Sequence, residues 1–311
     1  MTTGVAAVDC GTNSIRLLIA EAAPGGGLVE RLRRTEIVRL GQGVDATGEF
    51  HPDALARTFA ATESYAELIR QAGVSVHDIH FVATSATRDA RNREAFFAGI
   101  RQRLGVVPDV ITGDREAELS FEGALSRVRP EGEPVLVMDI GGGSTELIVG
   151  SAAGEMSFAI SLDIGSVRVT ERFLKTGPPA AADLAAAAAY VDDLLDSAGV
   201  DFAAVQTWIG VAGTATTLAG VYLELVEYDS EKVHGVLIPS GDLQALLERL
   251  STLTVDQIRA LPSMHPGRAD VVTGGTLIAS RVAARTRSAS GMLVSESDIL
   301  DGIALELLTA H

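Results

Sequence analysis

Two short segments of the chain, Asp9–Ser14 and Asp139–Glu146, combine residue types that are able to bind phosphate. In each segment an aspartate follows an apolar run, glycine and hydroxyl residues come next, and a second apolar run follows. This pattern predicts a strand, a tight turn and another strand. Turns of this composition direct several backbone N–H groups at one point and form an anion-binding concavity. Two such turns facing each other would hold a chain of phosphates and its metal ion from both sides.

The turn residues are the candidates for direct contact with phosphate. Glycine permits close approach of the backbone and positive φ, and the hydroxyl groups add hydrogen bonds. Ordinary hairpin turns also favour Asn and Gly, but three consecutive glycines beside an Asp and a Ser-Thr pair favour phosphate binding. The candidates are Gly11, Thr12, Asn13, Ser14, Gly141, Gly142, Gly143, Ser144 and Thr145.

Asp139 and Glu146 are the candidate ligands of a magnesium ion. Asp139 leaves one predicted strand and Glu146 enters the next, so the turn can bring both carboxylates to one ion. Mg²⁺ binds through a few carboxylates together with water and phosphate oxygens. Asp9, in the other turn, is a weaker candidate. An Asp that caps its own loop and a solvated Glu are the alternative interpretations.

Composition limits the class of partner. The 311 residues carry a formal net charge of −16, which argues against broad attraction to nucleic acid or to an anionic membrane. A phosphate site must therefore depend on local arginines, backbone amides and a divalent cation. The single cysteine, Cys10, excludes an internal disulfide and suits a reducing compartment. No secretory signal is visible, and we expect a cytoplasmic protein.

The order of predicted elements is nearly the same in the two halves of the chain. The first half predicts strands at 5–8, 15–20 and ending near 37–40, a helix at 52–71, a strand at 79–83, and then helix 93–104, strand 107–111 and helix 114–128. The second half predicts strands at 135–139, 145–150 and 155–162, helices at 165–174 and 181–198, a strand at 207–211, a helix after 213, a helical insertion at 241–287, strand 292–295 and helix 298–308.

Two copies of one mixed α/β plan, offset by 130 residues, imply a duplication. We expect one domain at 1–128 and another at 134–311, with the last helix able to pack back on the first domain. A cleft between the copies would be a favoured ligand site.

Several motifs resemble one protein superfamily. The two aspartate-glycine turns, the element order and Gly210–Thr217 resemble the actin, sugar kinase and heat-shock chaperone superfamily. Within it, Ile111–Ala117, Asp139–Glu146 and Arg268–Val271 resemble the exopolyphosphatase/guanosine pentaphosphatase family, in its short two-domain actinobacterial form, over about residues 5–308. The resemblance implies an α/β fold of two actin-like (ribonuclease H-like) domains related by duplication, with an interdomain cleft.

The resemblance also implies roles for individual residues. Glu116 matches the family's catalytic glutamate and would take a proton from an attacking water, although the helix dipole alone also favours a Glu in a first turn. Arg88 matches an arginine that contacts substrate phosphate. Gly213 and Thr214 match a turn that would hold a guanosine or inner phosphates. The family commonly has two adjacent acids where this chain has Arg115 and Glu116.

The function that follows is a magnesium-dependent exopolyphosphatase, which releases terminal orthophosphate from inorganic polyphosphate by direct attack of water. Two alternatives stay open: hydrolysis of the 5′ γ-phosphate of guanosine pentaphosphate (pppGpp), and a non-catalytic sensor of polyphosphate or alarmone. A homodimer is expected on the argument that paired subunits would lengthen a polyphosphate groove. The sequence does not decide whether Arg91, Arg93, Arg115 and Arg268 contact substrate.

Overall fold

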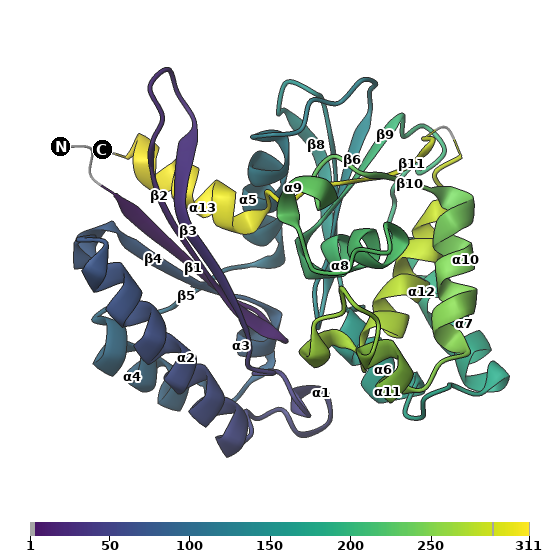
Figure 1. Cartoon of the computed structure of the whole chain (residues 1–311), viewed down its shortest axis with the longest axis horizontal. Helices are drawn as coiled ribbons and strands as arrows, with labels where there is room; N and C mark the ends of the chain where they lie inside the picture. Colours follow the sequence, from purple (N-terminus) through teal and green to yellow (C-terminus); the bar gives the residue numbers. More distant parts are fainter. Residues whose placement is uncertain (1–3, 288, 311) are drawn as a thin grey trace. The chain divides into compact units, whose positions relative to one another are not determined.

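The computed structural model describes residues 4–287 and 289–310, which form two compact units. The first unit consists of the chain up to Ser126 together with the segment that begins at Ile299. The second unit runs from Arg127 to Asp298. The last helix of the chain, shown in yellow in Figure 1, is therefore part of the first unit.

The first unit is built on a five-stranded mixed sheet in the order β3-β2-β1-β4-β5. The neighbouring pairs β1–β2 and β2–β3 are antiparallel, whereas β4 runs parallel to β1 and β5 parallel to β4. The strands are β1 (Val5–Cys10), β2 (Ser14–Ala22), β3 (Leu28–Ile37), β4 (Ile79–Ala83) and β5 (Asp109–Val110). The helices are α1 (Val44–Thr47), α2 (Pro52–Gln71), α3 (Ser85–Asp89), α4 (Arg93–Leu104), α5 (Gly113–Leu125) and α13 (Ile299–Thr309), with a 3₁₀ turn η1 (Val76–Asp78).

Both faces of this sheet are covered, which explains why β1 is buried at every position. On one face, side chains such as Val8 and Phe81 pack with Tyr65 of α2 and Phe96 of α4. On the other face, the sheet packs with α5 and α13, which cross at close range. The crossing depends on Gly302, because a Cβ there would overlap with the backbone carbonyl of Leu119. The C-terminal helix thus completes the core of the first unit.

The second unit contains a six-stranded mixed sheet in the order β10-β11-β9-β6-β7-β8. The strands are β6 (Val135–Ile140), β7 (Thr145–Gly150), β8 (Met156–Leu162), β9 (Thr207–Val211), β10 (Leu237–Pro239) and β11 (Gly291–Val294). The helices are α6 (Ser166–Phe173), α7 (Ala181–Ser197), α8 (Ala212–Tyr222), α9 (Ser230–Val233), α10 (Ser240–Ser251), α11 (Val255–Arg259) and α12 (Val272–Ala283), with a 3₁₀ turn η2 (Pro266–Arg268). Trp208 of β9 lies in its core.

The two sheets repeat one strand order, which confirms the mixed α/β class expected from the sequence. The series β3-β2-β1-β4-β5 in the first unit corresponds to β8-β7-β6-β9-β11 in the second, and β10 is an addition at the edge. All the predicted helices and strands are present. The helical insertion predicted at 241–287 consists of α10, α11, η2 and α12, and the elements that the sequence did not predict are short: α1, α3, α9, β10 and η1. Among the described residues, no helix is long and apolar enough to cross a membrane.

Candidate active site

The predicted turn of the first unit joins β1 to β2. Its backbone is closed by a hydrogen bond of 3.0 Å from the Gly11 N–H to the Ser14 carbonyl. The carbonyl groups of Thr12 and Asn13 accept hydrogen bonds from the N–H groups of the segment Val38–Gly41. Because these carbonyls are held on one side, the N–H groups of the turn are directed to the other.

Asn13 stands out in this turn because its side chain is buried without a partner. It is 6% exposed, and neither Oδ1 nor Nδ2 forms a hydrogen bond within the described part of the chain. An unsatisfied buried amide is expensive, so such a group points to a ligand that would complete it. By contrast, the neighbouring Thr12 hydroxyl already has a partner, the hydroxyl of Ser85, at 2.9 Å.

Asp9, at the end of β1, lies directly across from Arg16 of β2. The Arg16 guanidinium donates through Nε at 3.0 Å and Nη2 at 2.6 Å to one carboxylate oxygen of Asp9. The side chains are 12% and 7% exposed, respectively. The negative charge of Asp9 is therefore matched by an arginine within its own hairpin, which weakens its claim to be a metal ligand. Next to it, Cys10 is buried, and burial raises the pKa of its thiol well above the usual value.

Glu116 lies in the first turn of α5, which Thr112 caps by accepting a hydrogen bond from the Arg115 N–H at 3.2 Å. The Glu116 side chain receives a hydrogen bond of 2.8 Å from Nη1 of Arg88, in the last turn of α3. The same Nη1 donates to the carbonyl of Ile111 at 2.9 Å. The structure therefore brings together two sequence-predicted residues that are 28 positions apart.

The environment of Glu116 adjusts its acidity toward neutral pH. Burial raises the pKa of Glu116 to about 7, and the charge of Asp9 contributes in the same direction. The Arg88 ion pair and a hydrogen bond from Thr84 act in the opposite direction. A carboxyl group with a pKa near the operating pH is able to take up and release a proton efficiently.

The predicted turn of the second unit joins β6 to β7 and has the same backbone closure. The Gly141 N–H donates to the Ser144 carbonyl at 3.0 Å, as in the first turn. The carbonyls of Gly141 and Gly142 accept hydrogen bonds from the first N–H groups of α6. The N–H groups of Gly142 and Gly143 have no partner within the described residues. This turn therefore also presents donor groups to an anion.

The contact between the turn and α6 is close and specific. A Cβ at Gly165, just before α6, would overlap with the backbone of Gly142. Nε of Arg168 donates to the carbonyl of Gly143 at 2.8 Å. The hydroxyl of Thr145 donates to the carbonyl of Ile164 at 2.6 Å. These contacts fix the shape of the turn through the segment that follows β8.

Asp139 and Glu146 lie directly across from each other on β6 and β7. Both are buried, at 5% and 1% exposure, and directly opposite residues of an antiparallel pair share one face of the sheet. Ser161 of β8 donates a hydrogen bond of 2.7 Å to Glu146 Oε1. Two carboxylates on adjacent strands beside a turn that offers N–H groups fit the chemistry of Mg²⁺, which takes a few carboxylates and completes its shell with water or phosphate.

A larger metal centre is not formed by the residues that the structure describes. Among them, no group of three or more His, Cys, Asp or Glu side chains is arranged to hold a metal ion. The Asp139–Glu146 pair lies in the second unit and Asp9 in the first. Among the described residues, the second hairpin thus offers two carboxylates, those of Asp139 and Glu146, to a metal ion.

The third predicted turn, at the start of α8, lies beside the second turn. The hydroxyl of Thr214 donates to the carbonyl of Ile140, at the end of β6, at 2.8 Å. The guanidinium of Arg268 covers Gly213, since a Cβ at that position would overlap with it. The residue before Gly213, Ala212, has a φ of 59°, a left-handed conformation that a side chain rarely adopts.

The other arginines whose role the sequence left open form ion pairs or are exposed to solvent. Arg115 pairs with Glu118 on its own helix and with Glu306 of α13. Arg91 is 72% exposed and contacts Glu49 at 3.5 Å, and Arg93, at the start of α4, is exposed. Arg115 thus ties α5 to the C-terminal helix.

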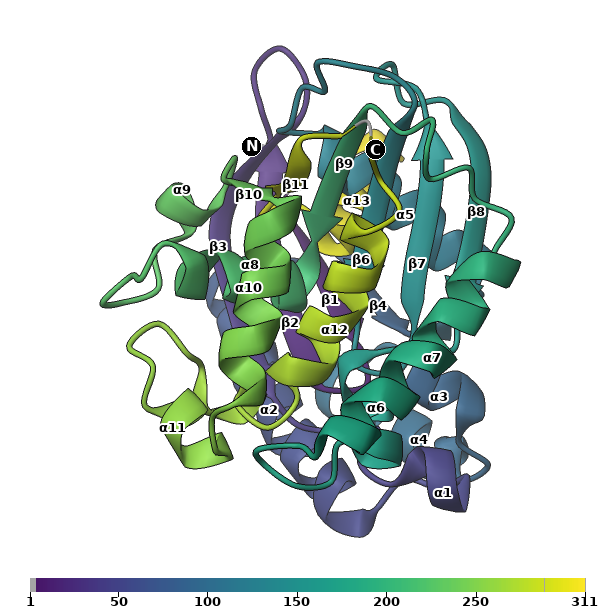
Figure 2. The ribbon, with the colours of Figure 1, turned by 90° about the vertical axis from the view of Figure 1, so that its right-hand side faces the viewer.

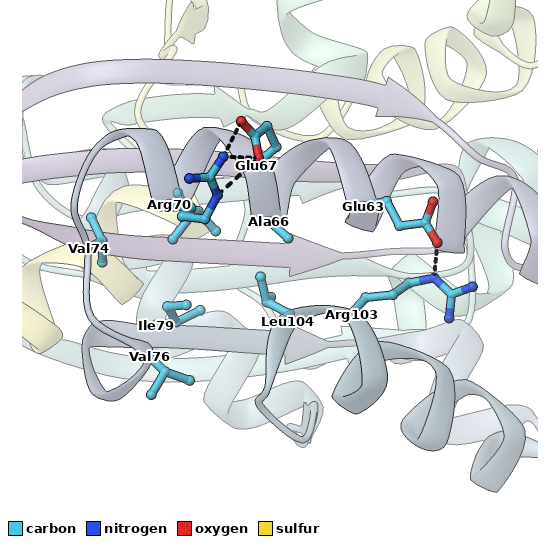
Figure 3. Close-up of a pocket in the computed structure, with 10 residues that line it drawn as sticks. Glu63, Ala66, Glu67, Arg70, Val74, Val76, Ile79, Arg103 and Leu104 are labelled. Carbon is cyan, nitrogen blue, oxygen red and sulfur yellow. Dashed lines mark hydrogen bonds and ion pairs between the residues drawn. The ribbon is translucent and has the colours of Figure 1, made fainter.

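A hollow elsewhere in the first unit does not contain any of the predicted site residues. Figure 3 shows this space of about 370 Å³, which lies between α2, α4 and the segment Val74–Ile79. Its charged side chains bond to each other: Arg103 to Glu63 and Arg70 to Glu67. Since its lining combines aliphatic residues with neutralised charges, it lacks the features of a phosphate site.

Sequence reasoning missed three side chains that support the candidate residues: Arg16, Ser161 and Thr84. A signal for Arg16 was available, because the offset of 130 residues that relates Asp9 to Asp139 also relates Arg16 to Glu146. Ser161 and Thr84 are ordinary polar residues at strand ends, and their hydrogen bonds depend on strand register that the sequence does not reveal.

Comparisons with known proteins identify the family of the chain. The model of the Ppx/GppA phosphatase family matches residues 18–311. The chain is 46% identical to Exopolyphosphatase 2 of Mycobacterium tuberculosis over 98% of both chains. Among solved structures, an exopolyphosphatase from Cytophaga hutchinsonii has a TM-score of 0.90 at 27% identity, covering 99% of this chain and 98% of that one. A Ppx/GppA family member from Aquifex aeolicus has a TM-score of 0.83 at 29% identity, covering 100% and 99%. The chain belongs to the Ppx/GppA phosphatase family.

Proposed function

We propose that this protein is a magnesium-dependent exopolyphosphatase that removes terminal orthophosphate from inorganic polyphosphate. The relative from M. tuberculosis that is 46% identical over nearly the whole chain carries the name Exopolyphosphatase 2. In this proposal the reaction uses a base poised near neutral pH, turns with N–H donors, and a pair of carboxylates for a cation.

The observation that carries the proposal is the placement of Glu116. Its carboxylate is buried in the first turn of α5 and oriented by Arg88, and its pKa is about 7. A general base for water attack needs a fixed orientation and a pKa close to the working pH. A Glu that merely caps a helix would be solvated and acidic. Arg88 orients the base, and its charge is also suited to the terminal phosphate, the role expected from the sequence.

The reaction that these groups serve is an in-line displacement at phosphorus. An oxygen of water forms a bond to the terminal phosphorus as the bond to the bridging oxygen breaks, which releases orthophosphate and shortens the polymer by one unit. Glu116 takes the proton from the water. The departing oxygen belongs to a phosphate and leaves as a weak base, so the mechanism requires no separate general acid.

The glycine-rich turns bind the phosphates in this proposal. N–H groups of Thr12 and Asn13 in one unit, and of Gly142 and Gly143 in the other, are donors fixed by the backbone. The orphan amide of Asn13 gains a partner when a phosphate oxygen arrives. Gly213 and Thr214 contribute backbone groups to the inner phosphates from the start of α8, and Ser14 and Ser144 contribute hydroxyl groups. The hydroxyls of Thr145 and Thr214 already donate to the carbonyls of Ile164 and Ile140, so Thr145 supports the shape of the turn.

Asp139 and Glu146 are the residues that would hold Mg²⁺. Bound there, the ion would supply positive charge to the phosphate oxygens. Asp9 is the weaker candidate because Arg16 already binds its carboxylate. Ser161 holds the orientation of Glu146 through its hydrogen bond, the kind of outer contact that tunes a metal ligand.

The test is phosphate release by the purified protein with Mg²⁺, offered long polyphosphate, short polyphosphate or pppGpp at matched terminal-phosphate concentrations. Release mainly from polyphosphate supports the proposal and gives the chain-length preference. Release mainly from pppGpp reassigns the protein to alarmone hydrolysis through the same residues. Binding of polyphosphate without release from any substrate identifies a sensor and contradicts the proposal.

A further inference from the structure

The two sheets of this protein end in four edge strands, and three of them carry features that prevent pairing with another chain. Edge strands expose unpaired N–H and C=O groups, which proteins protect with charges, short length or proline. β5 has two residues, and β10 has three and ends in Pro239. β3 is long, but five of its ten residues are charged.

β8 is the exception. Its seven residues, Met156–Leu162, contain no charge and no proline. Met156 is 38% exposed and Phe158 is 36% exposed, and both are large apolar side chains. β8 is the terminal strand of its sheet, next to β7, and Figure 2 shows it on the outer side of β7.

The duplication makes the contrast informative, because β8 corresponds to β3 in the other unit. The same position in the repeated fold therefore carries a charged edge in one copy and an uncharged edge in the other. The molecule as a whole has a formal net charge of −16, so a seven-residue edge strand without any charged residue is unusual for this chain. At β8 two copies of this acidic chain can approach closely.

The sequence of β8 is complementary to itself. The regular part of the strand, after the bulge near Ser157, reads Phe158, Ala159, Ile160, Ser161, Leu162. In an antiparallel pair centred on Ile160, Phe158 lies opposite Leu162, Ala159 opposite Ser161, and Ile160 opposite its own copy. Large apolar residues thus meet each other, and small residues meet each other, as a two-fold interface requires.

The charges that flank β8 favour this register. Centring the pair on Ala159 would place Glu155 opposite Asp163, two like charges, which is unfavourable. Centring it on Ile160 places Asp163 opposite Ser157. Asp163 also has a cation nearby, since Nη2 of Arg168 lies 3.7 Å from its carboxylate.

We propose that β8 is a dimerisation edge, at which this strand pairs antiparallel with β8 of a second copy of the chain about a two-fold axis through Ile160. Pairing joins the two six-stranded sheets into one continuous sheet and satisfies the outward N–H and C=O groups of both edges. The proposal goes beyond the proposed function and does not depend on it, because its evidence is the edge strand alone.

The first experiment measures the sedimentation velocity of the wild-type chain from about 1 to 100 µM, the range in which small interfaces associate. We expect a monomer–dimer equilibrium. Phe158→Lys places a charge on the edge and should weaken the dimer at least tenfold. The matched control is Leu237→Lys, because Leu237 is 43% exposed on β10, the opposite edge of the same sheet. That variant should dimerise like the wild type.

The second experiment tests the register by disulfide formation. Cys10 is the only native cysteine and is buried, so an introduced cysteine reports its own contacts. Ile160→Cys should form a covalent dimer on mild oxidation, because directly opposite residues lie within disulfide distance. Phe158→Cys should not, because the two copies of residue 158 would be about 13 Å apart along the strands.

The outcomes decide the proposal even if one variant folds poorly, because the wild-type measurement stands alone. A wild-type chain that stays monomeric at about 100 µM overturns it. A dimer that is unaffected by Phe158→Lys and is not cross-linked through residue 160 uses another surface and also overturns it. Cross-linking through 158 but not 160 contradicts the register. Far-ultraviolet circular dichroism confirms that each variant is folded.

Discussion

The β1–β2 and β6–β7 hairpins have the same backbone but opposite arrangements of charge. Both turns close with a hydrogen bond of 3.0 Å from the first glycine N–H to the serine carbonyl. Both place an aspartate at the end of the first strand, seven residues before its cross-strand partner. That partner is Arg16 in the first unit and Glu146 in the second.

The two hairpins therefore differ in the charge that lies opposite the aspartate. In the first unit each buried carboxylate of the site is matched by an arginine: Asp9 by Arg16 and Glu116 by Arg88. Glu116 is thereby held in one orientation. In the second unit two carboxylates, those of Asp139 and Glu146, lie directly across from each other, and these are the residues proposed above to hold Mg²⁺. The comparison shows that one register position carries Arg16 in the first hairpin and Glu146 in the second, so that Asp9 faces a cation across the strands whereas Asp139 faces a second carboxylate.

The largest effect is expected from Glu116→Gln, which removes the proton acceptor and keeps the shape. We expect kcat to fall about 10³-fold, within the range for loss of a general base, while polyphosphate binding changes little. Steady-state phosphate release and equilibrium binding measure the two quantities. Glu118→Gln is the control, because Glu118 lies on the same helix at the surface and pairs with Arg115. Equal turnover in the two variants would contradict the role of Glu116.

The next largest effect is expected from breaking the Asp9–Arg16 ion pair of the β1–β2 hairpin. Arg16→Gln leaves the buried Asp9 without its guanidinium, and loss of one partner of a buried pair typically costs about 3 kcal/mol of stability. The midpoint of urea unfolding should fall accordingly. Arg31→Gln breaks the Glu21 pair, in which the arginine is 55% exposed, and should change stability by about 1 kcal/mol or less. Similar midpoints for both variants would show that the Asp9–Arg16 pair is not special.

The carboxylate pair predicts a dependence on magnesium. Glu146→Gln should raise the Mg²⁺ concentration for half-maximal activity roughly 10- to 100-fold, an effect of the size seen when the support of a metal site is lost. Titration of phosphate release with MgCl₂ measures it, and a chelator should abolish the wild-type activity. Glu155→Gln, at an exposed position before β8, is the matched control. An unchanged magnesium dependence of Glu146→Gln would argue against the site.

The smallest effect is a shift of the pH profile. Because Glu116 must be ionised to accept a proton and its pKa is about 7, kcat/KM should rise with pH, reach half its maximum near pH 7 and level off above it. Arg88 lowers the pKa of Glu116, so Arg88→Gln should move this limb upward by about one pH unit. Arg91→Gln, which breaks an exposed contact with Glu49, should leave the limb in place. If Arg88→Gln leaves the limb of the pH profile in place, the ionisation that the limb reports is not that of Glu116.

The long elements of the fold were predictable from the sequence because hydrophobic periodicity and the repeat agree. The strands around the two turns, the helix α2 with Pro52 in its first turn, and α5 with its Thr112 cap all carry local signals. β10 was missed because three residues are too few to show a period, and its place is determined by pairing with β11. The short helix α3 was missed for the same reason.

The candidate residues were chosen from the sequence, but the partners of their side chains could not be. The sequence identified Arg88 and Glu116 separately, while their hydrogen bond depends on where the chain returns after β4 and β5. Ser161 bonds to Glu146 because of the register between β7 and β8. Such contacts arise from tertiary structure and leave no local pattern. Arg16 is different, since the internal repeat places it opposite Asp9 as Glu146 is placed opposite Asp139.

The position of α13 has a consequence for how the chain folds during synthesis. Helix α13 covers a face of the first sheet, where Ile299 and Ile303 pack with Val5 and Leu18. Residues of β1 leave the ribosome almost 300 positions before this helix is made. The second unit is continuous in sequence and is able to close its core earlier. During translation, the unit that is synthesised first is therefore completed last, and its uncovered apolar face is the surface that a nascent chain must protect from aggregation.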